Sequence, residues 1–311
     1  MALRISPILL VLQYPQPNIS AEERAKRLRA LTERIRVIRK EQLARRSSET
    51  AAMKRWLELL GSPIFQGKGK AMDPSLWVET LGPHYPYHRL KEPFQEWEDS
   101  GSTKDFIVWL ENEFIPAAIN GTFIPKKKRN LYTCWDLIAK DLKQYKAIYL
   151  TIEQRKSKEV TIKNGVFYDH TETPFHTGRL STNHSGRGAA VFVLGQGNKL
   201  YAGSHGMGVT GNPNSYFFHS GFLAGARVLA AGEIGVKNGN LRWVSSKSGH
   251  YKPGKKEVLY FLQWLQDCNV DLSKVAVQIE WEGEYYNASE VLSNNGNTTT
   301  LSSKRPNYVL F

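Results

Sequence analysis

Cysteine, long apolar runs and a membrane-spanning segment are scarce or missing in this 311-residue chain. Its two cysteines, Cys134 and Cys268, cannot build a disulfide framework or a cysteine zinc site, so both are expected to be reduced, buried thiols. The apolar run at residues 8–12 is far shorter than the roughly 20 residues of a spanning helix, and no clear signal-peptide cleavage site follows it. A membrane span is therefore not expected.

The common catalytic and nucleotide-binding signatures do not occur either. The sequence has no HExxH, Walker A or GxSxG pattern. The glycine-rich stretch 195–208 lacks the spacing and the following helix of a dinucleotide fingerprint. The loop 176–188 holds two histidines and two arginines, and it can bind phosphate or be a solvated loop. No metal site is expected.

Positive charge is plentiful and local. The chain carries a formal net charge of +13, and residues 22–46 contain ten Lys/Arg against four Glu. Within this segment Leu28, Leu31, Ile35 and Ile38 recur at helical spacing and give one apolar stripe. Such a basic helix can bind nucleic acid, anionic lipid or an acidic protein such as calmodulin, or it can pack on the domain surface. Nucleic acid is not favoured, because no aromatic residues are interleaved with the charges.

Composition divides the chain into three parts. Residues 1–61 are expected to form a basic helical arm, which a Gly-, Pro- and Lys-rich loop separates from the main domain at 75–282. That domain begins with aromatic-rich and helical segments and continues as strands joined by Asn-Gly turns. Residues 283–311 are expected to be a partly loose tail. The predicted class is α+β, an antiparallel sheet flanked by helices.

Histidines, serines and one glutamate gather in the segment 217–253, which otherwise has the composition of β-strands. A turn at residues 238–240 would place Glu233 across from about Ser245 and Ser246. Small neighbours would let a ligand or a helix approach closely. A carboxylate in such a strand is costly to bury without a partner, so Glu233 is the first candidate for a functional group.

The other polar residues of this segment have structural alternatives. His219, with Ser220 beside it, can belong to a site or be a hydrogen-bonded histidine of the core. Ser248, His250 and Tyr251 can line the same site, or they can form a turn whose hydroxyls cap the next helix.

Four motifs suggest a family. They are Leu200-Tyr201-Ala202-Gly203, His219-Ser220-Gly221-Phe222-Leu223-Ala224-Gly225, Ser248-Gly249-His250-Tyr251-Lys252-Pro253 and Asn269-Val270-Asp271-Leu272. With the segment 85–111 they resemble the C-terminal domain of the plant IQ-motif, calmodulin-binding (IQM) family, over about residues 77–279. Residues 32–46 resemble only a degenerate IQ motif, since Arg36 replaces the usual glutamine and the glycine is missing. The plant domain often has arginine at the position of Glu233.

Microbial proteins of the same type, with a glutamate at that position, are similar to bacterial effector ADP-ribosyltransferases that modify ubiquitin on threonine. This resemblance implies an ADP-ribosyltransferase-like fold and NAD as cofactor, with Glu233 steadying the ribose cation. The residues that it implies in catalysis are Glu233, His219 and Ser220. Those that it implies in NAD binding are Arg89, Phe222, Ser248, His250 and Tyr251.

Two functional hypotheses follow. The first is a mono-ADP-ribosyltransferase, a secreted virulence effector or toxin that acts in a host cytosol on a host protein, with ubiquitin as the candidate acceptor. The alternative is a non-catalytic, IQM-like module that binds calmodulin through residues 20–46.

Overall fold

The computed structural model describes residues 63–65, 67–73, 76, 79–80, 85, 87–102, 104, 106–126, 133–208 and 211–304. The expected arm at 1–61, with its basic helix at 20–46, lies outside the described residues. The described chain divides into two compact units. The first takes in residues within 74–148 and 214–216, and the second takes in residues within 64–73, 149–213 and 217–304.

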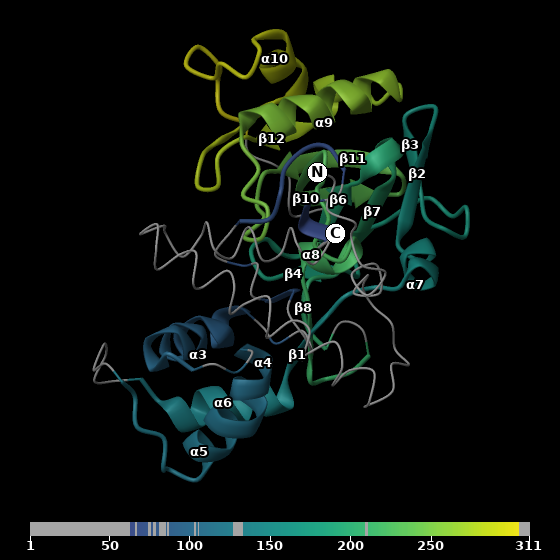
Figure 1. Cartoon of the computed structure of the whole chain (residues 1–311). Coiled ribbons are helices and arrows are strands. Elements are labelled where there is room, and N and C mark those ends of the chain that lie inside the picture. The colour runs from purple at the N-terminus through teal and green to yellow at the C-terminus, as the bar shows by residue number, and fades with distance from the viewer. Residues whose placement is uncertain are drawn as a thin grey trace, which may run out of the picture. The chain divides into compact units, whose positions relative to one another are not determined.

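The first unit is mainly helical (Figure 1). Its helices are α3 (Tyr87–Ser100), α4 (Phe106–Trp109), the π-helical turn η4 (Leu110–Phe114), α5 (Ile115–Ile119) and α6 (Trp135–Gln144). Strand β1 (Lys146–Ile148) follows α6 and neighbours β9 (Ser215–Phe217). Helix α6 is amphipathic, and its buried face carries Ile138, Ala139 and Leu142.

Aromatic rings fill the core of this unit, as the aromatic-rich sequence predicted. Phe94 meets Phe106 edge-on at 5.0 Å between centroids, and Phe114 meets Phe123 edge-on at 4.9 Å. Edge-to-face pairs are favoured over face-to-face sandwiches because the ring quadrupoles then attract. The rings thus tie α3, α4 and η4 together.

The second unit contains a mixed eight-stranded sheet in the order β13-β12-β11-β10-β6-β7-β2-β3 (Figure 1). Its strands are β2 (Glu159–Lys163), β3 (Val166–Tyr168), β6 (Ala190–Leu194), β7 (Leu200–Gly203), β10 (Ala230–Lys237), β11 (Asn240–Ser245), β12 (Ala276–Gln278) and β13 (Tyr285–Asn287). Outside it lie the hairpin of β4 (Ser181–Thr182) and β5 (Gly186–Arg187) and the short strand β8 (Gly206–Met207).

Helices of this unit are α7 (Ile152–Lys156), α8 (His219–Phe222), α9 (Lys255–Asp267) and α10 (Ala288–Ser293), with 3-10 turns η2 (Pro63–Phe65), η5 (Gln196–Asn198) and η6 (Leu272–Lys274). The α+β class is confirmed, but the sheet is not wholly antiparallel, because β11 and β12 run parallel. A parallel pair needs a crossover connection, and the chain between these two strands contains α9.

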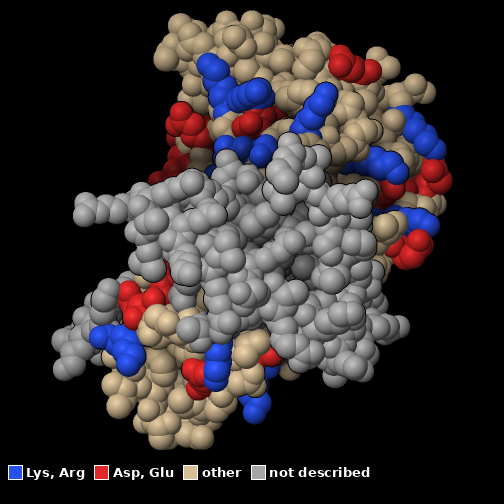
Figure 2. Space-filling model, in the orientation of Figure 1, with Lys and Arg blue, Asp and Glu red and all other residues tan. Residues whose placement is uncertain are grey.

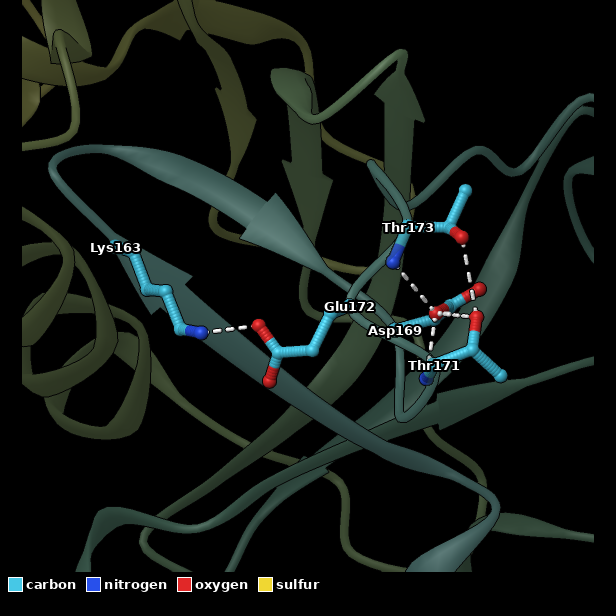
Figure 3. Close-up of polar contacts among 5 residues, drawn as sticks. All are labelled: Lys163, Asp169, Thr171, Glu172 and Thr173. Carbon is cyan, nitrogen blue, oxygen red and sulfur yellow. Dashed lines mark hydrogen bonds and ion pairs between the residues drawn. The ribbon is translucent and has the colours of Figure 1, made fainter.

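Asn-Gly turns close two hairpins, as predicted. Asn164 and Asn238 have φ of 50° and 49°, and each precedes a glycine that also has positive φ. The first hairpin joins β2 to β3, and the loop that follows is held by polar contacts (Figure 3). Asp169 Oδ1 accepts hydrogen bonds from the Thr171 backbone N–H at 2.8 Å and the Thr173 backbone N–H at 3.2 Å, and Glu172 pairs with Lys163.

The main hydrophobic core lies between the sheet and α9. Val258, Phe261, Leu262 and Leu265 are buried on one face of the helix, and Phe261 stacks on Phe192 of β6 with 4.4 Å between ring centroids. Because side chains alternate along a strand, this contact fixes which residues of each strand point into the core.

The expected loose tail is different in the structure. Residues 285–287 form β13, which pairs with β12, and Ala288 and Val291 of α10 are buried in the core. Two apolar positions at helical spacing gain more by burial than the polar composition of this segment suggested.

Both cysteines are free, as expected, but only Cys268 is half-buried, whereas Cys134 is exposed. In the part of the chain that the structure describes, no helix has both the length and the apolar character needed to cross a membrane.

Gly232 should be irreplaceable for steric reasons. A Cβ added there would lie 1.9 Å from the Ser245 carbonyl oxygen, so β10 and β11 would have to separate, whereas a Cβ on Gly249 meets no heavy atom within 4 Å. We expect Gly232→Ala to lower the free energy of unfolding by about 1–3 kcal/mol or more, and Gly249→Ala to change it by less than about 0.5 kcal/mol. Urea unfolding followed by circular dichroism measures both, and equal midpoints would contradict this strand spacing.

Candidate functional site

Glu233 lies in the middle of β10, on the face of the sheet opposite α9. Its neighbour Ile234 belongs to the core, so strand alternation turns the Glu233 side chain to the other face. Glu233 lies across from Ser245 of β11, as predicted, and from Val191 of β6. Its side chain is fully buried, and neither carboxylate oxygen has a hydrogen-bond partner.

The backbone beside Glu233 is held by a histidine. His219, at the start of α8, donates a hydrogen bond from Nε2 to the carbonyl oxygen of Gly232 at 2.8 Å. Burial, and to a smaller extent the nearby His205, lowers the pKa of His219 well below its usual value, so its imidazole is neutral. The hydrogen bond accounts for a buried histidine at this position.

Five more rings lie near Glu233 and His219. His205, which follows β7, lies 5.6 Å from the His219 ring and 5.7 Å from the His184 ring, between centroids. His184 sits in the turn between β4 and β5 and meets the edge of Trp281 at 4.7 Å. Phe218 packs on His205 at 5.5 Å and stacks on His250 at 4.9 Å.

Burial sets the protonation of the cluster. It lowers the pKa of His205 to about 3, with smaller contributions from His184 and His250. It also lowers the pKa of His184, which the Lys247 ammonium lowers further. Burial raises the pKa of Glu233, and the hydroxyls of Ser185 and Thr182, which lie near the carboxyl group without hydrogen-bond geometry, oppose that rise, as Lys247 does more weakly. The site therefore presents the neutral imidazoles of His184, His205 and His219 beside a carboxyl group that holds its proton more tightly than usual.

A groove open to solvent, of about 700 Å³, lies next to the cluster. Its lining includes Ser246, Gly249, Lys252, Trp281 and Glu284. Trp281 also contacts His184, so this side chain lies between the groove and the cluster.

The other residues named from the sequence have structural contacts. The Tyr251 hydroxyl donates to the Ala226 carbonyl at 2.8 Å, and its backbone N–H donates to Ser248 Oγ at 3.3 Å. Ser220 is fully buried in α8. Phe222 is a core side chain that meets Phe217 edge-on at 4.9 Å. Ser248 and Tyr251 thus form a turn, but the N-cap residue of α9 is Gly254, so the expected hydroxyl cap is absent there.

Arg89 belongs to the first unit, where its guanidinium pairs with Asp141 at 2.5 Å. Glu233, His219 and His250 are brought into one cluster, while Arg89 has this separate partner. The NAD site stays a prediction from the sequence.

Sequence reasoning missed His184, His205 and Trp281. His184 was part of the loop read as a phosphate site or a solvated loop, and His205 was part of the rejected nucleotide pattern. The available signal was positional: His205 follows the end of a buried strand, and side chains at strand ends often converge at one edge of a sheet.

Comparison with known proteins gives one consistent family. Residues 154–258 match the model of the IQ motif-containing protein middle domain. The chain is 30% identical to the IQ domain-containing protein IQM3 of Arabidopsis thaliana over 260 residues, which cover 80% of this chain and 51% of that protein. It is 29% identical to IQM2 of the same plant over 221 residues, covering 70% and 33%. The chain thus spans a third to a half of these relatives, and no solved structure matches it.

These matches overturn the leading functional hypothesis. The relatives are plant IQ domain-containing proteins, so the predictions of an ADP-ribosyltransferase and of a toxin or virulence effector are wrong. Nothing in the comparisons supports a host acceptor protein or ubiquitin. The four motifs pointed to the right family, and only the extension from that family to a microbial transferase failed. This chain belongs to the IQ motif-containing (IQM) protein family, with the family's middle domain at residues 154–258.

Proposed function

We propose that this protein is a calmodulin-binding module of the IQM type, in which residues 20–46 bind calmodulin. One observation carries the proposal: an IQM middle domain and a basic segment with a helical apolar stripe occur in the same chain. Calmodulin offers an acidic surface around Met-rich grooves, which receive amphipathic helices. The stripe would enter the groove, and the arginines would meet the acidic rim.

The middle domain is compatible with this proposal, because residues of its family motifs have structural roles that do not require catalysis. His219 and Tyr251, each in a family motif, donate hydrogen bonds to backbone carbonyls. Motifs that serve the fold are expected in a binding module as much as in an enzyme.

Charge on the described surface is mixed. On the face in Figure 2, basic and acidic side chains of the described residues are interspersed. The six net positive charges of residues 22–46 (ten basic, four acidic) are therefore a distinct feature of that segment, suited to an acidic partner.

The apolar stripe, and not charge alone, should decide calmodulin binding. In the full chain, we expect Leu31→Asp with Ile35→Asp to weaken the affinity for Ca²⁺-calmodulin at least about tenfold, because two anchors leave the groove. Titration calorimetry measures the change, and chelating calcium should abolish binding to the unmodified chain.

The matched control adds the same negative charge to the opposite helix face. A helix turns by about 100° per residue, which places Ala30 and Val37 away from the apolar stripe. The double variant Ala30→Asp with Val37→Asp should therefore lose only a small part of the affinity for calmodulin. Equal losses in the two double variants would reduce the interaction to charge attraction and contradict groove binding.

Removing residues 20–46 distinguishes between two roles of this segment, a calmodulin-binding arm and a helix packed on the domain surface. We expect a chain starting at residue 62 to lose calmodulin binding while its thermal midpoint stays within about 2 °C, because an arm of this kind contributes little core. A large fall in the midpoint would favour the packed surface helix instead.

A further inference from the structure

Three side chains outside the family motifs offer metal-ligand atoms to one point. The candidate atoms of His184, His205 and Glu233 all lie within 4.8 Å of one another. They come from the β4–β5 turn, the residue pair after β7 and the middle of β10. A tetrahedral ion with bonds of 2.0–2.2 Å needs its ligands about 3.3 Å apart. Small rotations can supply the difference, since His184 is exposed on a turn.

Glu233 provides a second, independent observation. Its relative exposure is 0%, and both carboxylate oxygens lack a hydrogen-bond partner, as does the nearby Ser185 hydroxyl. Burying a carboxyl group without partners costs about 1–3 kcal/mol or more. A structure that keeps such a group buried next to two imidazoles is arranged for something that binds there, and a cation would satisfy both oxygens.

Each of the two imidazoles has a ring nitrogen that can bind a cation. The contact on His205 Nδ1, from the Asn183 backbone N–H, is long at 3.4 Å and can give way.

Packing holds these rings in place. Trp281 lies against His184, and Phe218 lies against His205. His219 fixes the Gly232 carbonyl and with it the backbone from which Glu233 projects. Supporting contacts of this kind orient ligands and raise metal affinity.

We propose that His184, His205 and Glu233 form a binding site for one divalent first-row transition-metal ion. Two imidazole nitrogens and one carboxylate suit zinc or ferrous iron, whereas magnesium and calcium prefer oxygen ligands alone. Three protein ligands leave at least one coordination position for water or another small ligand. The ion enters beside the exposed His184. No metal was expected from the sequence, because the three residues share no short motif.

Metal binding to the chelator-stripped full chain tests the site. We expect one Zn²⁺ per chain by calorimetry and elemental analysis, and a thermal midpoint raised by a few degrees at excess zinc. Mg²⁺ and Ca²⁺ should produce neither effect. The same titration with Fe²⁺ under anaerobic conditions separates the two metals. The Irving–Williams order predicts that Zn²⁺ binds more tightly than Fe²⁺, and this result assigns the site to zinc. If Fe²⁺ binds more tightly than Zn²⁺, the site is assigned to iron.

Two exposed histidines provide matched variants that should both fold. His184→Ala should weaken zinc affinity at least about tenfold, whereas His170→Ala, which removes an exposed histidine outside the cluster, should leave it unchanged. Glu233→Gln should remove the zinc-dependent rise in the thermal midpoint while the apo protein stays folded by circular dichroism. The proposal is overturned if the wild type binds no zinc, if His184→Ala binds as tightly as the wild type, or if His170→Ala loses as much affinity.

Discussion

The burial of one carboxyl group in a central strand is the constraint on which the polar face of this sheet depends. Next to Glu233, β10 and β11 approach closely at Gly232, and His219 donates a hydrogen bond to the Gly232 carbonyl. A bulkier residue at 232 would move Ser245, and without His219 a buried carbonyl would lose its donor. Strand spacing and the imidazole contact therefore act together to hold an acid where water does not reach it.

The two faces of β10 have different roles, since one packs in the hydrophobic core and the other carries the polar cluster. Ile234 and Val236 face α9 and belong to the large core, while Glu233 faces the histidines. Close packing on the α9 face makes the strand rigid. Because the strand is rigid, the opposite face can keep polar groups without partners. In a mobile loop, the carboxylate of such a residue would turn toward solvent.

Residues of the family motifs also have structural roles. His219 and Tyr251 lie in the motifs that identified the IQM family, and both bond to backbone carbonyls. Ser248 accepts a hydrogen bond within its own turn. Such residues report a shared fold, and a fold can carry many functions. The step from motif to transferase is overturned by the matches to IQM proteins, which share these motifs' fold.

Local patterns in the sequence determined the features that depend on near neighbours. The Asn238–Gly239 turn closes the β10–β11 hairpin where the sequence predicted it, and a register shift between Gly235 and Val236 then places Glu233 opposite Ser245. Only the tertiary structure decided the rest. It brought His184 and His205 beside Glu233, placed β12 parallel to β11, and drew residues 285–293 into the sheet and core. Turn and helix preferences act over a few residues, whereas the pairing order of distant strands depends on how all their apolar faces are buried at once, and no single segment encodes that order.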